Sequence, residues 1–482
     1  MAEVSLKQKT AKGLFWGGLS NGVQQLMGAV FGIFMLRLLN VDDYGIVGML
    51  SIFTGIAMTI ISTGFSVALT NKRDATHDDY NAVFWFYFFF GLLLYAILFF
   101  CAPLIAKFYG YPELTALSRV VFLGFFINGL GISSYTVLFK KMMTRQQAIM
   151  EMSSLFIASV AGILLAISGF SYWALALQTL LHISLITGLR LVFAPWKPTL
   201  QINFAPLKQM FSFSIKLIFT NVLQQISGNI FSMILGKFYT KAQVGYYSNG
   251  QKWMGMGTQC INGMMTYVTQ PVLVHLQDDK KRQAHALRKL IRFGAFVSFP
   301  LMLGLAFIGP EFILVVTGEK WLPSVPFLQL FCVWGSIVFL NTYYTHLIYT
   351  HGKSNIYMNG SIVIIVLQLL AVACLYSHGI LPMFRGYLAV NFVGLGIWHF
   401  YVHRLIGLRL RDVLKDILPY LLITLACFFV TWLITRNLAN PTIVLMAKIV
   451  ISGILYLGVM KMSKSVIFKE SLNYLLKNRI RD

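Results

Sequence analysis

Apolar runs of roughly 20 residues recur along the whole chain, and they set the tightest limit on its fold. A helix of that length crosses the roughly 30 Å of hydrocarbon in a bilayer. The run 82–90 is apolar or aromatic throughout, whereas a strand of a membrane barrel alternates apolar and polar residues. Hydrophobic residues make up 57% of the 482 positions and charged residues only 11%, too few to cover a water-soluble globule. We therefore predict an all-α, polytopic membrane protein.

The apolar runs and the turn residues between them predict about 14 transmembrane helices. The eighth run is long for a single crossing and is rich in glycine, which allows a kink. The expected spans are 14–37, 44–69, 82–105, 115–139, 147–168, 173–193, 207–236, 242–274, 290–314, 324–349, 356–377, 384–403, 413–434 and 442–462.

An internal repeat relates the two halves of the chain at a constant offset of 200 residues. The matched pairs include Asn21 and Asn221, Gln24 and Gln224, Gln25 and Gln225, and Gly45 and Gly245. Six crossings return the chain to its starting side, so two six-helix lobes would be related by a parallel pseudo-two-fold axis. We expect an N-lobe at 1–200 (helices 1–6) and a C-lobe at 201–405 (helices 7–12). Two further helices and a basic amphipathic tail would occupy 406–482.

Lysine and arginine are concentrated in the loops on one side of the predicted membrane. The basic segments 280–282 and 477–481 lie on that side, whereas the opposite loops are short and carry few basic residues. Because basic loops stay in the cytoplasm, both termini are predicted to be cytoplasmic. The net charge of +23 then reflects topology and attraction to anionic lipids. We expect membrane lipids as partners and no nucleic acid.

Apart from the basic residues at span ends and in loops, four lie within predicted spans, where a charge costs about 2.5–3.5 kcal/mol on insertion scales. They are Arg119, Lys216, Lys252 and Lys448. Lys216 and Lys252 lie near mid-membrane on adjacent helices, which favours a lined aqueous cavity over pairing with helix carbonyls. Arg119 and Lys448 lie nearer the outer ends, where they either join this cavity or extend to the interface.

The 16 carboxylates are all expected in loops or near the ends of spans. A cation site or a proton relay in a membrane normally needs a carboxylate inside the bilayer. A cavity with lysines and no acids prefers an anionic ligand.

Amide side chains form a repeated helix face. Asn21, Gln24 and Gln25 lie at i, i+3 and i+4 and therefore share one face of the first helix. The second half repeats this face with Asn221, Gln224 and Gln225. Two interpretations remain open: the amides join neighbouring helices by hydrogen bonds, or they line the space between the lobes and bind sugar hydroxyls.

Signatures of catalysis are missing from the sequence, which has no nucleophile motif, P-loop or metal-ligand spacing. The five cysteines lie in apolar runs without CxxC pairing, so neither a disulfide nor a metal role is expected. We predict no catalytic residue, no metal and no cofactor, and therefore no enzyme.

Three short segments carry a resemblance to a known family. They are Arg37–Gly45, Ser62–Leu69 and Ala102–Tyr109. Together with the fourteen-span plan, they resemble the polysaccharide exporter branch, of colanic-acid-exporter type, of the multidrug/oligosaccharidyl-lipid/polysaccharide (MOP) superfamily. The resemblance implies two six-helix lobes, a central cavity, two additional helices and alternating access. It also implies transfer of an undecaprenyl-diphosphate-linked glycan from the cytoplasmic to the periplasmic leaflet, and it identifies no binding residue.

These observations together predict a lipid-linked oligosaccharide flippase of the bacterial inner membrane. Lys216 and Lys252, with Arg119 and Lys448, would hold the diphosphate while the glycan fills the polar cavity. We expect a monomer that has glycan polymerases as candidate partners. One alternative is a multidrug or cation antiporter of the same superfamily, which the placement of the acids disfavours. Another is a membrane glycan polymerase or glycosyltransferase, which would need larger outer loops rich in acidic residues or arginine.

Overall fold

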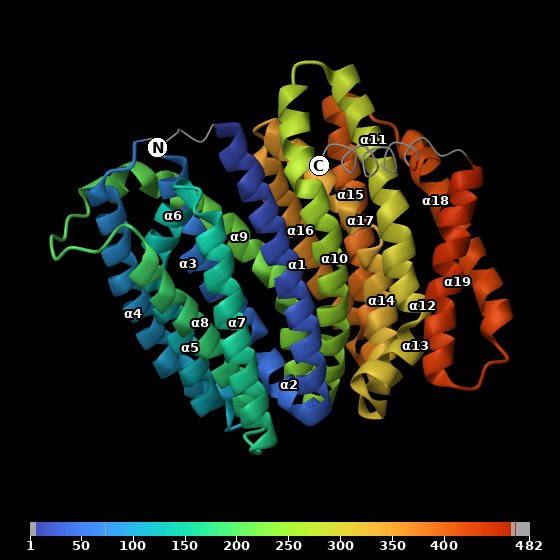
Figure 1. The fold of residues 1–482 in the computed structure, drawn as a ribbon, viewed down its shortest axis with the longest axis horizontal. Coiled ribbons are helices and arrows are strands. Elements are labelled where there is room, and N and C mark those ends of the chain that lie inside the picture. The colour runs from blue at the N-terminus through green and yellow to red at the C-terminus, as the bar shows by residue number, and fades with distance from the viewer. Residues whose placement is uncertain (1–5, 73, 464–467, 469–482) are drawn as a thin grey trace. The chain divides into compact units, whose positions relative to one another are not determined.

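Helices make up almost all of the structure, a computed structural model that describes residues 6–72, 74–463 and 468 (Figure 1). No strand occurs among those residues. A backbone in hydrocarbon has to satisfy its own hydrogen bonds, and a helix does so within one segment. The predicted all-α membrane class is therefore confirmed.

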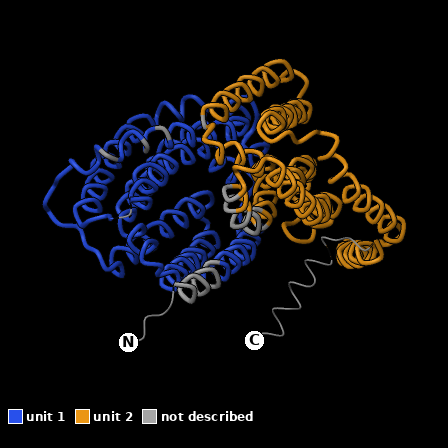
Figure 2. The backbone as a smooth tube through the Cα atoms, turned by 90° about the horizontal axis from the view of Figure 1, so that it is seen from above, with its two compact units in different colours: residues 1–245 blue, residues 246–482 orange. Residues whose placement is uncertain are grey.

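Contacts within the chain define two compact units, residues 1–245 and 246–482 (Figure 2). Unit 1 contains α1 (Leu6–Leu38), α2 (Val41–Met49), α3 (Ser51–Asn71), α4 (His77–Tyr109), α5 (Leu114–Leu130), α6 (Ile132–Lys140), α7 (Thr144–Ile167), α8 (Tyr172–Phe193) and α9 (Ala205–Phe238). α10 (Lys241–His275) begins in unit 1 and continues into unit 2. Unit 2 continues with α11 (Lys280–Ser298), η1 (Phe299–Leu303), α12 (Gly304–Phe307), α13 (Gly309–Phe312), η2 (Ile313–Thr317), η3 (Glu319–Ser324), α14 (Val325–Gly335), α15 (Val338–Thr350), α16 (Ser354–Leu375), η4 (Tyr376–His378), α17 (Ile380–Ile406), α18 (Leu410–Thr435) and α19 (Pro441–Met462).

Among the described residues, ten helical segments are long and apolar enough to cross a bilayer, and two helix pairs, bent by 43° and 41°, bring the number to 12. The bent pairs are α5 with α6, and the segment 319–335 with α15. These segments match all but two of the expected spans. The expected spans 207–236 and 242–274 coincide with α9 and α10, whose side chains are described only in part. The count of fourteen crossings stays a prediction.

The division into units does not follow the expected lobe boundary. By its contacts α9 belongs to unit 1, where it packs along α3, whereas the C-lobe was expected to begin at 201. The predicted N-lobe (1–200), C-lobe (201–405) and C-terminal segment (406–482) describe which helices would move together during transport. That division stays a prediction. The basic tail after residue 463 lies outside the described residues, apart from residue 468.

Inside unit 1, α7 packs against α1 on one side and against α8 on the other (Figure 1). α5 lies between α8 and α4. Close packing of α7 on α8 depends on Gly162, because a Cβ there would come within 2.9 Å of the Gln178 side chain. The interior faces of α1, α7 and α8 are thereby brought together.

The helix boundaries reproduce the sequence repeat. α1 and α9 end 200 residues apart, and so do the starts of α2 and α10. Equivalent residues cap both starts: the backbone N–H of Asn40 donates to Asp43 Oδ2 at 2.8 Å, and that of Thr240 donates to Gln243 Oε1 at 3.2 Å. The two copies therefore fold alike at this corner.

Equivalent glycines also bring the two copies into contact. A Cβ at Gly45 would lie 2.0 Å from the carbonyl oxygen of Lys241, and a Cβ at Gly245 would lie 2.4 Å from that of Val41. Positions 41 and 241 are themselves equivalent, so the contact is reciprocal about a local two-fold axis. Only glycine allows the two backbones to approach so closely.

The loop between α4 and α5 holds the start of α10. Lys241 forms an ion pair with Glu113, and its Nζ lies 4.3 Å from the centre of the Tyr111 ring. The hydrogen bond from Lys241 lowers the pKa of the Glu113 carboxyl below its ordinary value. This corner of unit 1 is therefore fixed by backbone contact and by charge.

In unit 2, α16 packs on α17, and α18 pairs with α19 and contacts α11 (Figure 1). Arg288 of α11 donates to both carboxylate oxygens of Asp416 in α18, at 2.7 and 3.1 Å. Arg292 lies 3.6 Å from the same carboxylate. Two arginines thus compensate one buried acid, which joins the α18–α19 pair to the rest of the unit.

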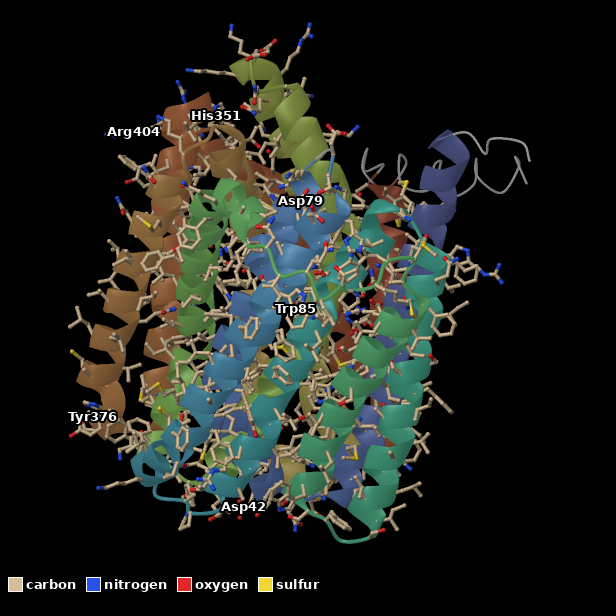
Figure 3. The ribbon with its side chains drawn as sticks, turned by 90° about the vertical axis from the view of Figure 1, so that its left-hand side faces the viewer. Asp42, Asp79, Trp85, His351, Tyr376 and Arg404 are labelled. Carbon is tan, nitrogen blue, oxygen red and sulfur yellow. The ribbon has the colours of Figure 1, made fainter. Side chains whose placement is uncertain are left out.

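The labelled side chains show how the chain alternates within each unit (Figure 3). Asp42 and Asp79, which are separated by α3, lie at opposite ends of the helices of unit 1. In unit 2, His351 and Arg404 lie at one end of the helices and Tyr376 lies at the other. α16 connects His351 to Tyr376, and α17 connects Tyr376 to Arg404. This alternation is the one expected of successive crossings. The cytoplasmic placement of both termini stays a prediction.

Candidate functional site

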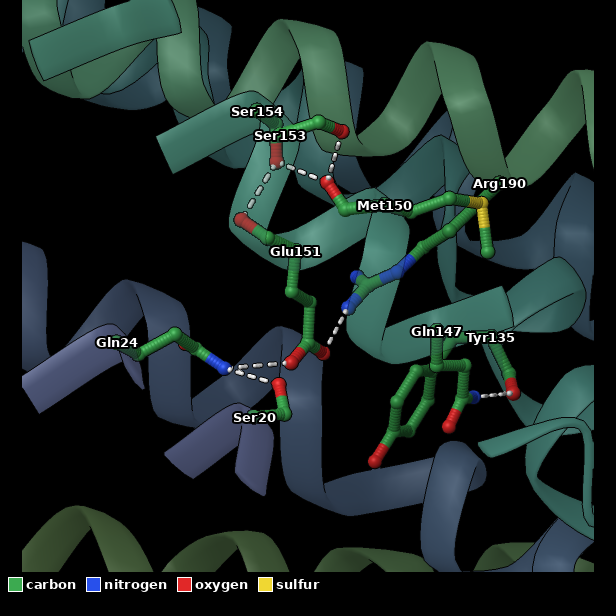
Figure 4. Close-up of polar contacts among 9 residues, drawn as sticks. All are labelled: Ser20, Gln24, Tyr135, Gln147, Met150, Glu151, Ser153, Ser154 and Arg190. Carbon is green, nitrogen blue, oxygen red and sulfur yellow. Dashed lines mark hydrogen bonds and ion pairs between the residues drawn. The ribbon is translucent and has the colours of Figure 1, made fainter. Parts of the chain in front are cut away.

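Polar side chains from three helices meet inside unit 1 (Figure 4). Gln24 of α1 donates through Nε2 to Glu151 Oε2 of α7 at 2.9 Å and to Ser20 Oγ at 2.8 Å. Arg190 of α8 donates through Nη2 to Glu151 Oε1 at 3.2 Å. Each carboxylate oxygen of Glu151 therefore has its own donor, one an amide and the other a guanidinium.

Arg190 is held on a second side by an aromatic ring. Its guanidinium carbon lies 4.8 Å from the centre of the Tyr135 ring, which is a cation–π contact. Gln147 Nε2 donates to the backbone carbonyl of Tyr135 at 3.4 Å. Arg190 Nε is buried and has no hydrogen-bond partner among the described residues. The Arg190 side chain is 14% exposed and that of Glu151 is 30% exposed, so the carboxylate is the more accessible partner of the pair.

Two of the carboxylates that were expected in loops or near span ends lie about two turns inside their helices. Glu151 lies two turns, about 10 Å, inside α7, which qualifies as a membrane span. Asp416 lies similarly inside α18. Both acids are paired with arginines from neighbouring helices, and this pairing lowers the cost of placing them in a span.

A cavity of about 270 Å³ adjoins this network between α2, α7 and α8. It is lined by Tyr44, Val47, Leu155, Ala158, Leu175, Gln178, Thr179 and His182. Leu155 follows Glu151 by one turn on α7, and His182 precedes Arg190 by two turns on α8. The cavity and the network therefore lie on the same faces of both helices.

The two central lysines of the sequence prediction lie in different units. Lys252 is half-buried on α10 in unit 2. Lys216 lies on α9, but its side chain falls outside the described residues. Their joint role in binding an anionic ligand stays a prediction.

The other two predicted cations have protein partners. Lys448 is 8% exposed, and its Nζ lies 2.7 Å from Glu311 Oε1 and 4.6 Å from the centre of the Phe307 ring. Arg119 donates through Nε to the carbonyl of Phe99 at 3.5 Å and lies over its ring at 4.2 Å. Sequence reasoning missed the Lys448–Glu311 pair because its members lie 137 residues apart along the chain. A role in substrate binding stays a prediction for both.

The two amide faces have different surroundings. In the first copy Asn21 is exposed, Gln25 is half-buried and Gln24 reaches Glu151. In the second copy Asn221 is half-buried and Gln224 is exposed, while Gln225 Oε1 accepts from Asn229 Nδ2 of its own helix at 3.2 Å. Gln225 also lies against α3, 2.8 Å from where a Cβ of Gly55 would be. Gln24 of the first copy therefore joins α1 to a charged group on α7, whereas Gln225 of the second hydrogen-bonds within α9 and packs against α3.

Glu151, Arg190, Tyr135 and the cavity residues were not singled out from the sequence. One available signal was a glutamate surrounded by apolar and small residues within an apolar run. Among the described residues, no three His, Cys, Asp or Glu side chains come close enough together to hold a metal ion.

Comparison with known proteins gives the family. The polysaccharide biosynthesis protein family matches residues 34–326. An uncharacterised membrane protein of the cps region of Klebsiella pneumoniae is 24% identical over 69% of this chain and 70% of its own length. The lipopolysaccharide biosynthesis protein WzxC of Escherichia coli K12 is 21% identical over 69% and 68%. The teichuronic acid biosynthesis protein TuaB of Bacillus subtilis 168 is 23% identical over 77% and 78%.

Two solved structures share the fold. The lipid II flippase MurJ in an inward closed conformation superposes with a TM-score of 0.73 at 13% identity, over 95% of this chain and 99% of its own. An inward-facing multidrug resistance MATE transporter of the MOP superfamily gives 0.65 at 16% identity, over 80% and 94%. The family match covers more than half of the chain and begins just before the first segment of the resemblance. The chain therefore belongs to the polysaccharide biosynthesis protein family and has the fold of MOP-superfamily transporters.

Proposed function

We propose that this multi-pass membrane protein is a flippase for a lipid-linked glycan and works by alternating access. The observation that carries the proposal is the polysaccharide biosynthesis family match, on a fold shared with a lipid II flippase. Relatives named for lipopolysaccharide and teichuronic acid biosynthesis support a role in the assembly of cell-surface glycans. The protein transports its substrate and forms no glycosidic bond.

The interior of unit 1 supplies the chemistry that a glycan needs. Sugar hydroxyls both donate and accept hydrogen bonds, so they need amide, hydroxyl and carboxylate partners inside an otherwise apolar membrane protein. Gln24, Glu151 and the polar residues of the adjoining cavity provide such groups on facing helices. The apolar outer surface of the helices would meanwhile stay in contact with lipid.

The lipid diphosphate is assigned to basic residues within the spans. Lys216 and Lys252 attract it, with Arg119 and Lys448 as further candidates, and the substrate is an undecaprenyl-diphosphate-linked oligosaccharide or repeat unit. Transfer runs from the cytoplasmic to the periplasmic leaflet of a bacterial inner membrane, with both termini in the cytoplasm. The membrane potential acts on such a charged carrier with about 2.3 kcal/mol per charge per 100 mV. Lobe rocking exposes the cavity to either side in turn.

Reconstitution into liposomes tests this function. Purified protein is placed in vesicles that contain a fluorescent undecaprenyl-diphosphate-linked oligosaccharide, and a membrane-impermeant reagent reports how much label is in the outer leaflet. Transfer between leaflets without growth of the saccharide is the expected result. Vesicles that show no transfer, or that form new glycosidic bonds, would contradict the flippase.

The same vesicles test the two lysines. Lys216→Ala and Lys252→Ala are each expected to slow transfer at least about tenfold, because each removes a charge-assisted contact with the diphosphate. Normal amounts of inserted protein serve as the control. Unchanged transfer in both variants would overturn this part of the proposal.

A second candidate function is export of a cationic drug, which Glu151 favours because a carboxylate inside a span suits a cation. The ion pair with Arg190 weakens this candidate, since the charge of Glu151 is already compensated. Uptake of a cationic dye by the reconstituted vesicles under an imposed pH gradient, without transfer of the glycan lipid, would favour it over the flippase.

A further inference from the structure

The cavity between α2, α7 and α8 is lined by neutral groups. Half of its lining residues are polar, namely Tyr44, Gln178, Thr179 and His182. The other half are apolar, namely Val47, Leu155, Ala158 and Leu175. None of the eight is Asp, Glu, Lys or Arg. Hydroxyl, amide and imidazole groups beside apolar patches match a ligand that carries both hydroxyls and C–H faces.

The polar groups of α8 are held in place before any ligand enters. Gln178 Nε2 donates to Ser159 Oγ of α7 at 3.3 Å, and its stem occupies the space that Gly162 leaves free. Thr179 Oγ1 donates to the carbonyl of Leu175 at 2.9 Å, so the lone pairs of its oxygen remain available as acceptors. Groups fixed in this way bind a ligand at a smaller entropic cost.

The charged groups next to the cavity are already paired with each other, so they do not favour a charged ligand. Glu151 lies one turn from the cavity wall, and both of its oxygens already accept hydrogen bonds from Gln24 and Arg190. The cavity is also small: its roughly 270 Å³ lies just below the roughly 300–1,000 Å³ of pockets for drug-sized ligands. The space inside it holds about one ring of a ligand.

From this geometry we infer that the cavity is a subsite for one uncharged sugar residue of the transported glycan. The inference rests on the proposed flippase function. It adds where one sugar of the substrate binds and that this sugar is uncharged. Gln178 and Thr179 are its specificity-determining residues, because they present an amide and a hydroxyl to the sugar hydroxyls. The lipid diphosphate binds elsewhere.

Two nearly isosteric substitutions test the subsite, Gln178→Leu and Thr179→Val. Ser184→Ala is the matched control: it lies on the same helix, its Oγ donates to the carbonyl of Leu180 at 2.8 Å, and it does not line the cavity. Dissociation constants are measured in nanodiscs for a lipid diphosphate with an uncharged hexose oligosaccharide and for the same lipid diphosphate without sugar. Leaflet transfer is measured for the sugar-bearing lipid in vesicles.

Each of the two cavity variants is expected to weaken binding of the sugar-bearing lipid about 3- to 10-fold, in keeping with one lost hydrogen bond. Binding of the sugar-free lipid, and both affinities of Ser184→Ala, should stay within about twofold of wild type. Equal losses for both lipids, or no loss for the sugar-bearing lipid, would overturn the subsite. A wild-type protein that transfers no glycan lipid would instead overturn the proposed function itself.

Discussion

The two copies of the repeat share a corner and differ in what their amide faces meet. At the corner, α1–α2 and α9–α10 break at equivalent residues, carry equivalent caps and touch through Gly45 and Gly245. About four turns back along each helix, the copies diverge. Gln24 of the first copy contacts the ion pair of Glu151 and Arg190, whereas Gln225 of the second contacts Asn229 of its own helix.

This difference teaches that duplication fixes the backbone, while the helices packed alongside decide the chemistry. In unit 1, α1 lies against α7 and therefore faces Glu151, whereas α9 lies against α3 and faces Gly55. The same pattern of amides thus takes part in a charged network in one copy and in helix packing in the other. We place the glycan-contacting groups on the first copy, whereas the two lysines proposed for the diphosphate belong to the second.

The largest expected effect comes from breaking the shared corner. Gly45→Val and Gly245→Val each place side-chain atoms where a Cβ alone would already overlap a backbone carbonyl, so the two backbones have to separate. We expect either variant to lose most of its folded protein in the membrane. Size-exclusion profiles and unfolding temperatures in detergent measure this loss.

Gly228→Ala on α9 is the matched control, because nothing lies within 4 Å of the added Cβ. It should behave as wild type or slightly better, since alanine favours a helix over glycine. If one of the two corner variants folded normally while the other did not, the reciprocal contact would be disproved.

The next largest effect is expected from breaking the ion pair between Arg190 and Glu151. Arg190→Ala leaves Glu151 inside a span without its cation, and we expect the free energy of unfolding to fall by about 2–3 kcal/mol. This is below the value for fully buried pairs, because the Glu151 side chain is 30% exposed. The double variant Arg190→Ala/Glu151→Gln should recover part of the loss, as measured by a double-mutant cycle. A double variant that is less stable than Arg190→Ala alone would contradict the pairing.

The smallest effect concerns the ion pair at the corner of the second copy. The pKa of Glu113 is lower in the folded protein, so its pair with Lys241 stabilises the fold above the unfolded pKa of about 4.3. That contribution disappears as the pH falls through the folded pKa. Glu113→Gln should cost only about 0.5 kcal/mol at pH 7, because both side chains are partly exposed.

Unfolding temperatures at pH 7 and pH 4 test this sign. The difference between wild type and Glu113→Gln should be larger at pH 7 and should shrink at pH 4. A difference that grew in acid would show that Glu113 is not stabilised as a carboxylate.

Much of the fold was predictable because it depends on local patterns. Twelve of the expected spans match apolar helices or bent helix pairs, since hydrocarbon leaves a long apolar segment few alternatives to a helix. The repeat also predicted that helix breaks would recur at the same offset. The bends at Gly131 and near Ile337 lie beside glycines, Gly131 and Gly335, which allow a kink but do not fix its angle.

The site was predictable only in part. Gln24 was identified by its spacing, but its partner Glu151 lies 127 residues away along the chain. Glu151 was assigned to a span end, because the sequence does not show that Arg190 would be there to compensate it. The small cavity depends on which faces of α2, α7 and α8 meet, which no single helix specifies.

Transfer of a glycan lipid by two equivalent variants is the most direct measurement of the functional difference between the copies. Gln24→Leu and Gln224→Leu change the same position of the repeat, one beside Glu151 and the other exposed. In vesicles with equal amounts of inserted protein, Gln24→Leu should slow transfer about tenfold or more, and Gln224→Leu should stay within about twofold of wild type. Equal losses, or a larger loss in Gln224→Leu, would contradict a functional site built on the first copy.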